Sequence, residues 1–268
     1  MPCTLTCFGV GDGRPNGDRH HSSYLYEFGG VTLLIDCGEP VSRSYKASGR
    51  NYDLVDRIFL SHLHFDHTGG FFMLMQGFWL EQRQKELPVH MPAEGIPLFQ
   101  EMLKGACLFD ELLPFRLSYE PLRAGQTVPQ GDVRVTPYHT SHLESFRKTF
   151  QAAHPGEYAA YSFLIEAPGL RIGHSADLGK PEDLEPLLRE PLDLLVCELA
   201  HFEPESLFQY LQGRPIAHCI FVHLGRHSWQ NLPKTRALAK RMLPGMKLSF
   251  PADLDSFSIP SCAGPREF

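Results

Sequence analysis

Four residues in the segment SHLHFDHTGG, residues 61–70, have the types and the spacing of metal ligands. Alternate side chains of an extended segment point the same way, so His62 and His64 can aim at one point. Asp66 and His67 follow where the chain turns, and they can aim at a second point nearby. Imidazole and carboxylate groups are natural ligands of zinc, iron and manganese. A lone histidine is more often structural, but this cluster needs a shared partner, so the segment predicts metal binding.

The elements that must position these residues are short strands that alternate with helices. We expect strands over Thr4–Phe8, Ser22–Phe28, Val31–Asp36, Arg57–Leu60, Val133–Tyr138, Tyr161–Glu166, Leu170–Gly173, Leu192–Glu198, Cys219–Val222 and Lys247–Phe250. We expect helices from Gly69 to about Arg83 and over Pro97–Leu108, Glu182–Arg189, Pro204–Leu211 and Lys234–Met242. This alternation is typical of a layered α/β fold. Reactive groups then lie in loops that a rigid sheet positions.

Several motifs along the chain resemble those of the metallo-β-lactamase superfamily and occur in the same order. HLHFDH is similar to the HxHxDH signature of that superfamily, and LLIDCGEP, residues 33–40, is similar to the strand that precedes it. TSHLES, RIGHSADLG and CIFVHLGRH follow later in the chain. The resemblance implies one domain over residues 1–268, folded as a four-layer αβ/βα sandwich of two mixed sheets with helices outside.

The resemblance also implies a ligand set for two divalent metal ions, zinc first, with manganese or iron as alternatives. The first ion would bind His62, His64 and His142; the second would bind Asp66, His67 and His223; Asp177 would bridge the two. His139 lies three residues before His142 and competes for its role, but we prefer His142 and place His139 outside the ligand set. Two such ions can share a water and lower its pKa toward neutrality, which gives a bridging hydroxide nucleophile.

The identity of the bridging residue narrows the branch of the superfamily. An aspartate at position 177, where β-lactam-hydrolysing members use cysteine, favours the branch of ribonuclease Z and the cyclic phosphodiesterases. Ribonuclease Z often carries a long arm between the residues equivalent to His142 and Asp177. Only 34 residues, 143–176, separate them here, and two expected strands occupy part of that stretch. A small phosphodiesterase therefore fits better than precursor-tRNA cleavage.

CELAHFEP, residues 197–204, carries the expected proton donor. It resembles the end of a strand in small phosphodiesterases, where an acid and a histidine stand three residues apart. We predict that His201 protonates the leaving oxygen and that Glu198 orients His201. With Asp66, they complete the predicted catalytic set.

Composition excludes several other classes of protein. The net charge is −6, without the basic surplus that long nucleic acids require. No stretch approaches the roughly 20 apolar residues of a membrane span, and no signal peptide is apparent. The scattered cysteines contain no CxxC pair and predict reduced thiols and a cytoplasmic location; they are Cys3, Cys7, Cys37, Cys107, Cys197, Cys219 and Cys262.

The sequence thus predicts a dinuclear metal-dependent phosphodiesterase that acts on a small or medium substrate. Three alternatives stay open: a ribonuclease Z-like endonuclease, a hydrolase of esters, lactones or thioesters, and a metal-binding module without catalysis. The metal core by itself suits all the hydrolases. Besides the substrate, the expected partner is a second copy of this chain, because homodimers are the commonest soluble oligomers.

Overall fold

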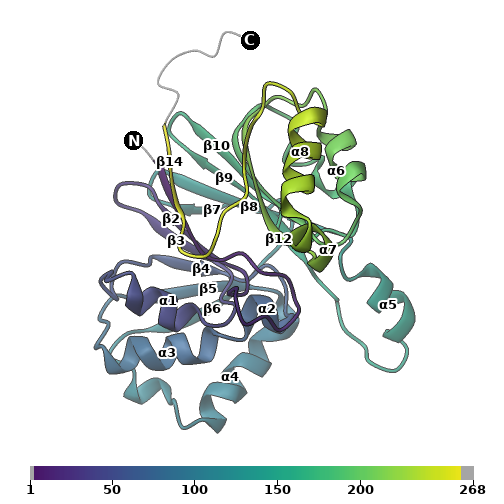
Figure 1. Cartoon of the computed structure of the whole chain (residues 1–268). Helices are drawn as coiled ribbons and strands as arrows, with labels where there is room; N and C mark the ends of the chain where they lie inside the picture. Colours follow the sequence, from purple (N-terminus) through teal and green to yellow (C-terminus); the bar gives the residue numbers. More distant parts are fainter. Residues whose placement is uncertain (1–2, 261–268) are drawn as a thin grey trace. The chain divides into compact units, whose positions relative to one another are not determined.

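The computed structural model describes residues 3–260, which form two compact units, each built on one mixed β-sheet (Figure 1). The N-terminal unit comprises Thr4–Leu122 with Ala252–Phe257, and the C-terminal unit comprises Arg123–Pro251 with Cys3 and residues 258–260. Both sheets have seven strands. The mixed α/β class predicted from the sequence is confirmed, whereas the single domain stays a prediction.

The N-terminal sheet has the strand order β14-β1-β2-β3-β4-β5-β6. Its strands are β1 (Cys3–Gly9), β2 (Ser23–Glu27), β3 (Thr32–Ile35), β4 (Arg57–Phe59), β5 (Leu87–Met91), β6 (Leu117–Pro121) and β14 (Ser256–Ile259). Gly29 and Gly30 both have positive φ, 67° and 141°, and they turn β2 into the antiparallel β3. From β3 to β6 all pairs are parallel. The carboxyl ends of β3 and β4 therefore lie at one edge of the sheet.

Helices pack against this sheet through apolar side chains. They are α1 (Val41–Ala47), α2 (Phe65–Thr68), α3 (Phe71–Leu80) and α4 (Ile96–Gly105), with short 3₁₀ helices η1 (Ala93–Gly95) and η2 (Asp110–Leu112). Phe71 and Phe78 of α3 share a buried core with Leu34 of β3 and Ile58 of β4. Strands β3 and β4, which precede candidate site residues, are therefore held in place by a buried core.

The C-terminal sheet has the order β13-β12-β11-β10-β9-β8-β7. Its strands are β7 (Val128–Gln130), β8 (Val133–His139), β9 (Tyr161–Ala167), β10 (Leu170–His174), β11 (Leu192–Leu199), β12 (Ile216–Leu224) and β13 (Lys247–Ser249). The strands from β10 to β13 are parallel. Every residue of β11 is buried, as expected for an interior parallel strand that is covered on both faces.

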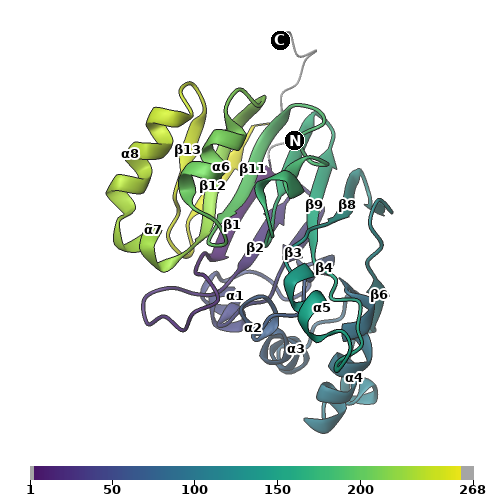
Figure 2. The same cartoon turned by 90° about the vertical axis from the view of Figure 1, so that its right-hand side faces the viewer.

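The helices of the C-terminal unit are α5 (Glu144–Phe150), α6 (Pro204–Leu211), α7 (Arg226–Gln230) and α8 (Leu232–Met242), with the 3₁₀ helix η3 (Pro181–Leu184). Helices α6 and α8 flank strands β11 to β13 (Figure 2). Leu207 and Phe208 of α6 and Ala239 of α8 pack with Phe221 of β12 in one buried core. Helix α5 buries no residue and projects away from the sheet of its unit (Figure 1).

One helix prediction was wrong, and another placed the end of its helix too late. Glu182–Arg189 forms only the short η3 followed by turns, because Pro186 supplies no N–H and interrupts a helix. The helix expected to run to Arg83 ends at Leu80. Gln82 then adopts a left-handed φ of 58°, and the chain turns inward. Arg83 is fully buried and donates hydrogen bonds to three backbone carbonyls rather than reaching solvent.

The six cysteines within the described residues are free thiols, and Cys262 lies outside those residues. Burial raises the pKa of Cys37 and of Cys197 well above the usual value for a thiol. Both thiols therefore stay protonated and pack as small apolar groups. No helix within residues 3–260 is both long and apolar enough to cross a bilayer.

Candidate functional site

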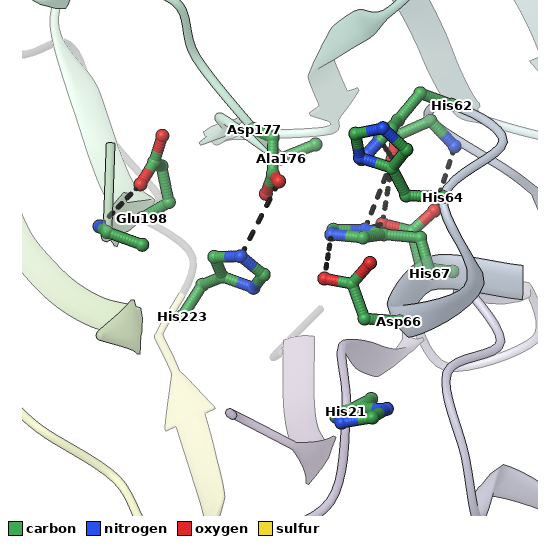
Figure 3. Close-up of polar contacts among 12 residues, drawn as sticks. His21, His62, His64, Asp66, His67, Ala176, Asp177, Glu198 and His223 are labelled. Carbon is green, nitrogen blue, oxygen red and sulfur yellow. Dashed lines mark hydrogen bonds and ion pairs between the residues drawn. The ribbon is translucent and has the colours of Figure 1, made fainter. Parts of the chain in front are cut away.

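The segment that holds the clustered histidines leaves the carboxyl end of β4 and begins α2. His64 is the N-cap residue of α2 and keeps an extended backbone, with φ −63° and ψ 146°. The rings of His62 and His64 lie 4.7 Å apart between centroids, and one nitrogen of each ring lies within 4.8 Å of one on the other (Figure 3). The structure thus brings together the two imidazoles that the sequence paired.

Asp66 and His67 lie on α2 itself and form a second pair. Nε2 of His67 lies 3.4 Å from Oδ2 of Asp66 (Figure 3). His67 is almost fully buried. An imidazole nitrogen and a carboxylate oxygen that face each other at this distance can bind the same metal ion.

Asp36 fixes the orientation of His67. It follows β3, is completely buried, and accepts a hydrogen bond from Nδ1 of His67 at 2.7 Å. The same carboxylate accepts hydrogen bonds from the backbone N–H and the hydroxyl of Ser61, at 2.8 and 2.9 Å. Because Nδ1 of His67 carries the proton in this bond, Nε2 presents its lone pair toward Asp66.

The C-terminal unit gathers three imidazoles around one carboxylate. Oδ2 of Asp177 lies 3.7 Å from Nε2 of His142, 3.5 Å from Nε2 of His223 and 3.8 Å from Nε2 of His201. These distances exceed the usual range of a hydrogen bond. Asp177 and His223 are both nearly buried, and Figure 3 shows His223 pointing at Asp177. His142 and His223, together with Asp177, belong to clusters of side chains that could hold a metal ion, and His201 does not.

A β-bulge orients the side chain of His223. Glu198 of β11 pairs with Val222, and Leu199 pairs with Leu224, so His223 is the extra residue of β12. Its φ of 47° is uncommon for a residue other than glycine. Ala176, directly before Asp177, has a φ of 45°. Bulges and strained residues of this kind are enriched at functional sites, where they redirect a side chain.

Glu198 and His201 form a hydrogen-bonded pair. Nδ1 of His201 lies 2.8 Å from Oε1 of Glu198, which is 1% exposed. The Glu198 carboxylate also accepts hydrogen bonds from the backbone N–H groups of Leu178 and Ala200, at 2.9 and 2.7 Å. The buried acid is therefore satisfied by several donors, and it directs Nε2 of His201 toward Asp177.

Asp183 joins the two loops that carry His142 and Asp177. Its Oδ2 accepts hydrogen bonds from the backbone N–H of Ser141 at 2.8 Å and from that of Gly179 at 2.9 Å. A Cβ on Gly179 would lie 2.5 Å from the backbone of Ser141, so the loops approach as closely as glycine allows.

Sequence reasoning missed Asp36 and Asp183, and only Asp36 left a signal. Asp36 directly follows the buried strand Thr32–Ile35, where a carboxylate is costly unless it is paired. Asp183 stands in a segment that resembles an ordinary helix start. His139, the competitor of His142, is exposed and stacks on Tyr161 with 4.7 Å between ring centroids.

The family model described as "Anti-Pycsar protein Apyc1" matches residues 3–205, more than two thirds of the chain. The chain belongs to the anti-Pycsar protein Apyc1 family. This Apyc1-family chain is also 30% identical over 151 residues to a ribonuclease Z of Bradyrhizobium sp. (strain ORS 278), a match that covers 56% of the chain and 50% of the relative. It spans about half the length of the curated relatives it matches.

Solved structures confirm the metallo-β-lactamase fold of this Apyc1-family chain. The metallo-β-lactamase fold protein YhfI of Bacillus subtilis superposes with a TM-score of 0.73 at 18% identity, over 96% of this chain and all of the other. A diphosphatase from the PhnP family superposes with a TM-score of 0.68 at 16% identity, over 96% of this chain and 97% of the other. Zinc-bound PqqB from Methylobacterium extorquens superposes with a TM-score of 0.69 at 13% identity, over 95% of this chain and 99% of the other. The resemblance to the ribonuclease Z and cyclic phosphodiesterase branch is confirmed.

Proposed function

We propose that this chain is a dinuclear metal-dependent hydrolase, and that it cleaves phosphodiesters of small or medium size. One ion would bind His62, His64 and His142, the other would bind Asp66, His67 and His223, and Asp177 would bind both. Zinc is the first choice because imidazole and carboxylate suit it, and manganese and iron accept the same donors.

The observation that carries this proposal is the position of two proposed ligands around Oδ2 of Asp177, with Nε2 of His142 at 3.7 Å and Nε2 of His223 at 3.5 Å. Imidazoles that face a buried carboxylate at more than hydrogen-bonding distance can share a cation with it, which supports the proposal. The orientation of His67 by Asp36 adds support, because a carboxylate on Nδ1 is the usual partner of a metal-binding histidine.

When bound, two divalent ions supply a water molecule of lowered pKa and offset charge on the phosphate. The chain's own residues then handle the proton of the leaving group. Glu198 holds Nδ1 of His201, so Nε2 of His201 can carry a proton to the leaving oxygen. Burial fixes Glu198, and the hydrogen bond of Glu198 to Nδ1 orients the ring.

The substrate class is a proposal on three grounds. The relatives include a ribonuclease Z and a PhnP-family diphosphatase. The acidic net charge of −6 argues against a long nucleic acid. The family name describes its members as anti-Pycsar proteins. We propose that this chain exerts such an anti-Pycsar activity by hydrolysing a phosphodiester.

The test is metal analysis of protein purified without chelator, together with hydrolysis of bis(p-nitrophenyl) phosphate. We expect about two metal ions per chain and phosphodiester turnover that a chelator abolishes and added zinc or manganese restores. Two metal ions without phosphodiester turnover would direct the search to the runner-up, a hydrolase of esters, lactones or thioesters. Absence of metal after reconstitution would overturn the proposal.

We further propose a cytoplasmic location, since the cysteines of the described residues are free. We also expect a homodimer, which sedimentation of the purified chain would test.

A further inference from the structure

The loop of residues 10–22, which joins β1 to β2, lies against a proposed metal ligand of its own unit. A Cβ added to Gly13 of this loop would lie 3.1 Å from Oδ2 of Asp66 and 3.4 Å from Cγ of the same side chain. Nonbonded carbon atoms attract best at about 3.5–4.0 Å. A side chain at position 13 would therefore press on the Asp66 carboxylate.

Space, rather than backbone conformation, is the reason for glycine at position 13. Gly13 does not have the left-handed φ that favours glycine. Gly38, which follows β3, shows how closely the loop and α2 are packed, because a Cβ there would collide with the backbone of both Asp66 and His21. The loop thus meets α2 as closely as residues without side chains allow.

Asp253 closes the base of the loop. Its Oδ1 accepts a hydrogen bond from the backbone N–H of Val10 at 3.0 Å, and its Oδ2 accepts one from the backbone N–H of His20 at 2.7 Å. The N–H of Gly11 donates to the backbone carbonyl of His20 at 2.7 Å. One carboxylate and one backbone bond hold the two ends of the loop together, which limits how far the loop can move from α2.

We propose that Gly13 is a positioning residue for the Asp66 carboxylate, and that Asp253 keeps Gly13 in place. The proposal rests on the proposed dinuclear site, in which Asp66 and His67 bind the second ion. The loop backs the same oxygen, Oδ2 of Asp66, that lies 3.4 Å from Nε2 of His67. An added methyl group or a displaced loop would change where this oxygen points.

Zinc affinity, measured by competition with a chelator, tests the positioning role. Gly13→Ala should lower the affinity for one of the two ions about 10-fold, as loss of a contact that supports a ligand commonly does. It should leave the affinity for the other ion nearly unchanged, whereas a general loss of stability would weaken both. Wild-type affinity for both ions, or an equal loss for both, would overturn the role of Gly13.

Gly17→Ala is the matched control for this measurement. Gly17 belongs to the same loop, lacks a left-handed φ, and has no atom within 4 Å of an added Cβ. This variant should bind both ions as the wild type does. A loss of affinity in Gly17→Ala equal to that in Gly13→Ala would contradict the proposal.

Asp253→Ala tests the base of the loop without adding an atom near the site. It should cause the same selective loss of affinity for one ion. Asp255→Ala is its control, since Asp255 carries the same charge in the same segment and accepts the N–H of Ala252. Wild-type affinities in Asp253→Ala would overturn the role of Asp253.

A double-mutant cycle in urea separates this proposal from the proposed function. In chelator, Gly13→Ala should lower the urea midpoint of the wild-type chain but not that of Asp66→Ala, because the second change removes the carboxylate that the methyl group meets. The effect of alanine on the unfolded chain is the same in both backgrounds and cancels. A wild-type chain that binds no metal would overturn the proposed function, and the cycle would still decide the contact. Equal changes of midpoint in both backgrounds would overturn it.

Discussion

The carboxylate of Asp183 accepts hydrogen bonds from both the backbone N–H and the hydroxyl of Ser141, each at 2.8 Å. Ser141 precedes His142, and the same carboxylate holds the N–H of Gly179, two residues after Asp177. The Asp183 side chain thus ties together the loops of two proposed ligands. Such supporting contacts commonly set the affinity of a metal site.

Asp183→Asn should weaken metal binding, because a neutral amide oxygen accepts weaker hydrogen bonds than a carboxylate from the backbone N–H groups of Ser141 and Gly179. We expect metal affinity to fall about 10- to 100-fold, measured by competition with a chelator. Asp193→Asn is the control, since Asp193 is also buried and accepts a backbone hydrogen bond from Arg171 of the same unit. Equal affinities in the two variants would contradict the role of Asp183.

Asp36→Asn should also reduce metal affinity, by about 10- to 100-fold, because the neutral amide holds the imidazole of His67 less firmly. Asparagine tolerates the positive φ of 59° at this position, so the backbone can persist. Asp56→Asn, a buried acid that holds the N–H of Thr32, controls for general destabilisation. If Asp36→Asn binds metal as tightly as Asp56→Asn, the orienting role is wrong.

His201→Ala should keep both metal ions and lower kcat by about 10²- to 10⁴-fold, the usual contribution of a general acid. The defect should shrink for substrates with good leaving groups, which need less protonation. His154→Ala, which changes an exposed histidine of the same unit, should behave as the wild type. Full turnover of His201→Ala on every substrate that the wild type accepts would eliminate the proton-donor role.

The buried His90 should make the N-terminal unit sensitive to acid. Burial, and then the charge of Arg57, lowers the pKa of His90 from 6.5 to about 4. Because the folded pKa lies below the unfolded one, stability is present above pH 6.5 and is lost as the pH falls toward 4. Between pH 7 and pH 5 the loss should be about 2 kcal/mol.

Urea unfolding in chelator at both pH values measures this effect. His90→Gln, which retains an acceptor for the Arg57 guanidinium, should lose about 2 kcal/mol less than the wild type over this range. His154→Gln should change nothing, since that side chain is exposed. A loss of stability identical in His90→Gln and the wild type would contradict this account.

Local patterns were enough to locate most of the elements. The apolar runs at Leu192–Glu198 and Cys219–Val222 predicted the strands β11 and β12, because strands buried on both faces consist mostly of apolar residues. Helix α5 escaped prediction because it buries no residue and so has no apolar face to create a periodic signal.

The sequence by itself determined the chemistry of this protein: a dense set of imidazoles and carboxylates, at spacings that resemble one superfamily. The tertiary structure decided which groups support that set. Asp36 reaches His67 because β3 and β4 are parallel neighbours. Asp183 reaches Ser141 from 42 residues away. Such contacts depend on how strands pair and loops close. A local pattern of residues does not encode which residues far apart in the sequence come into contact.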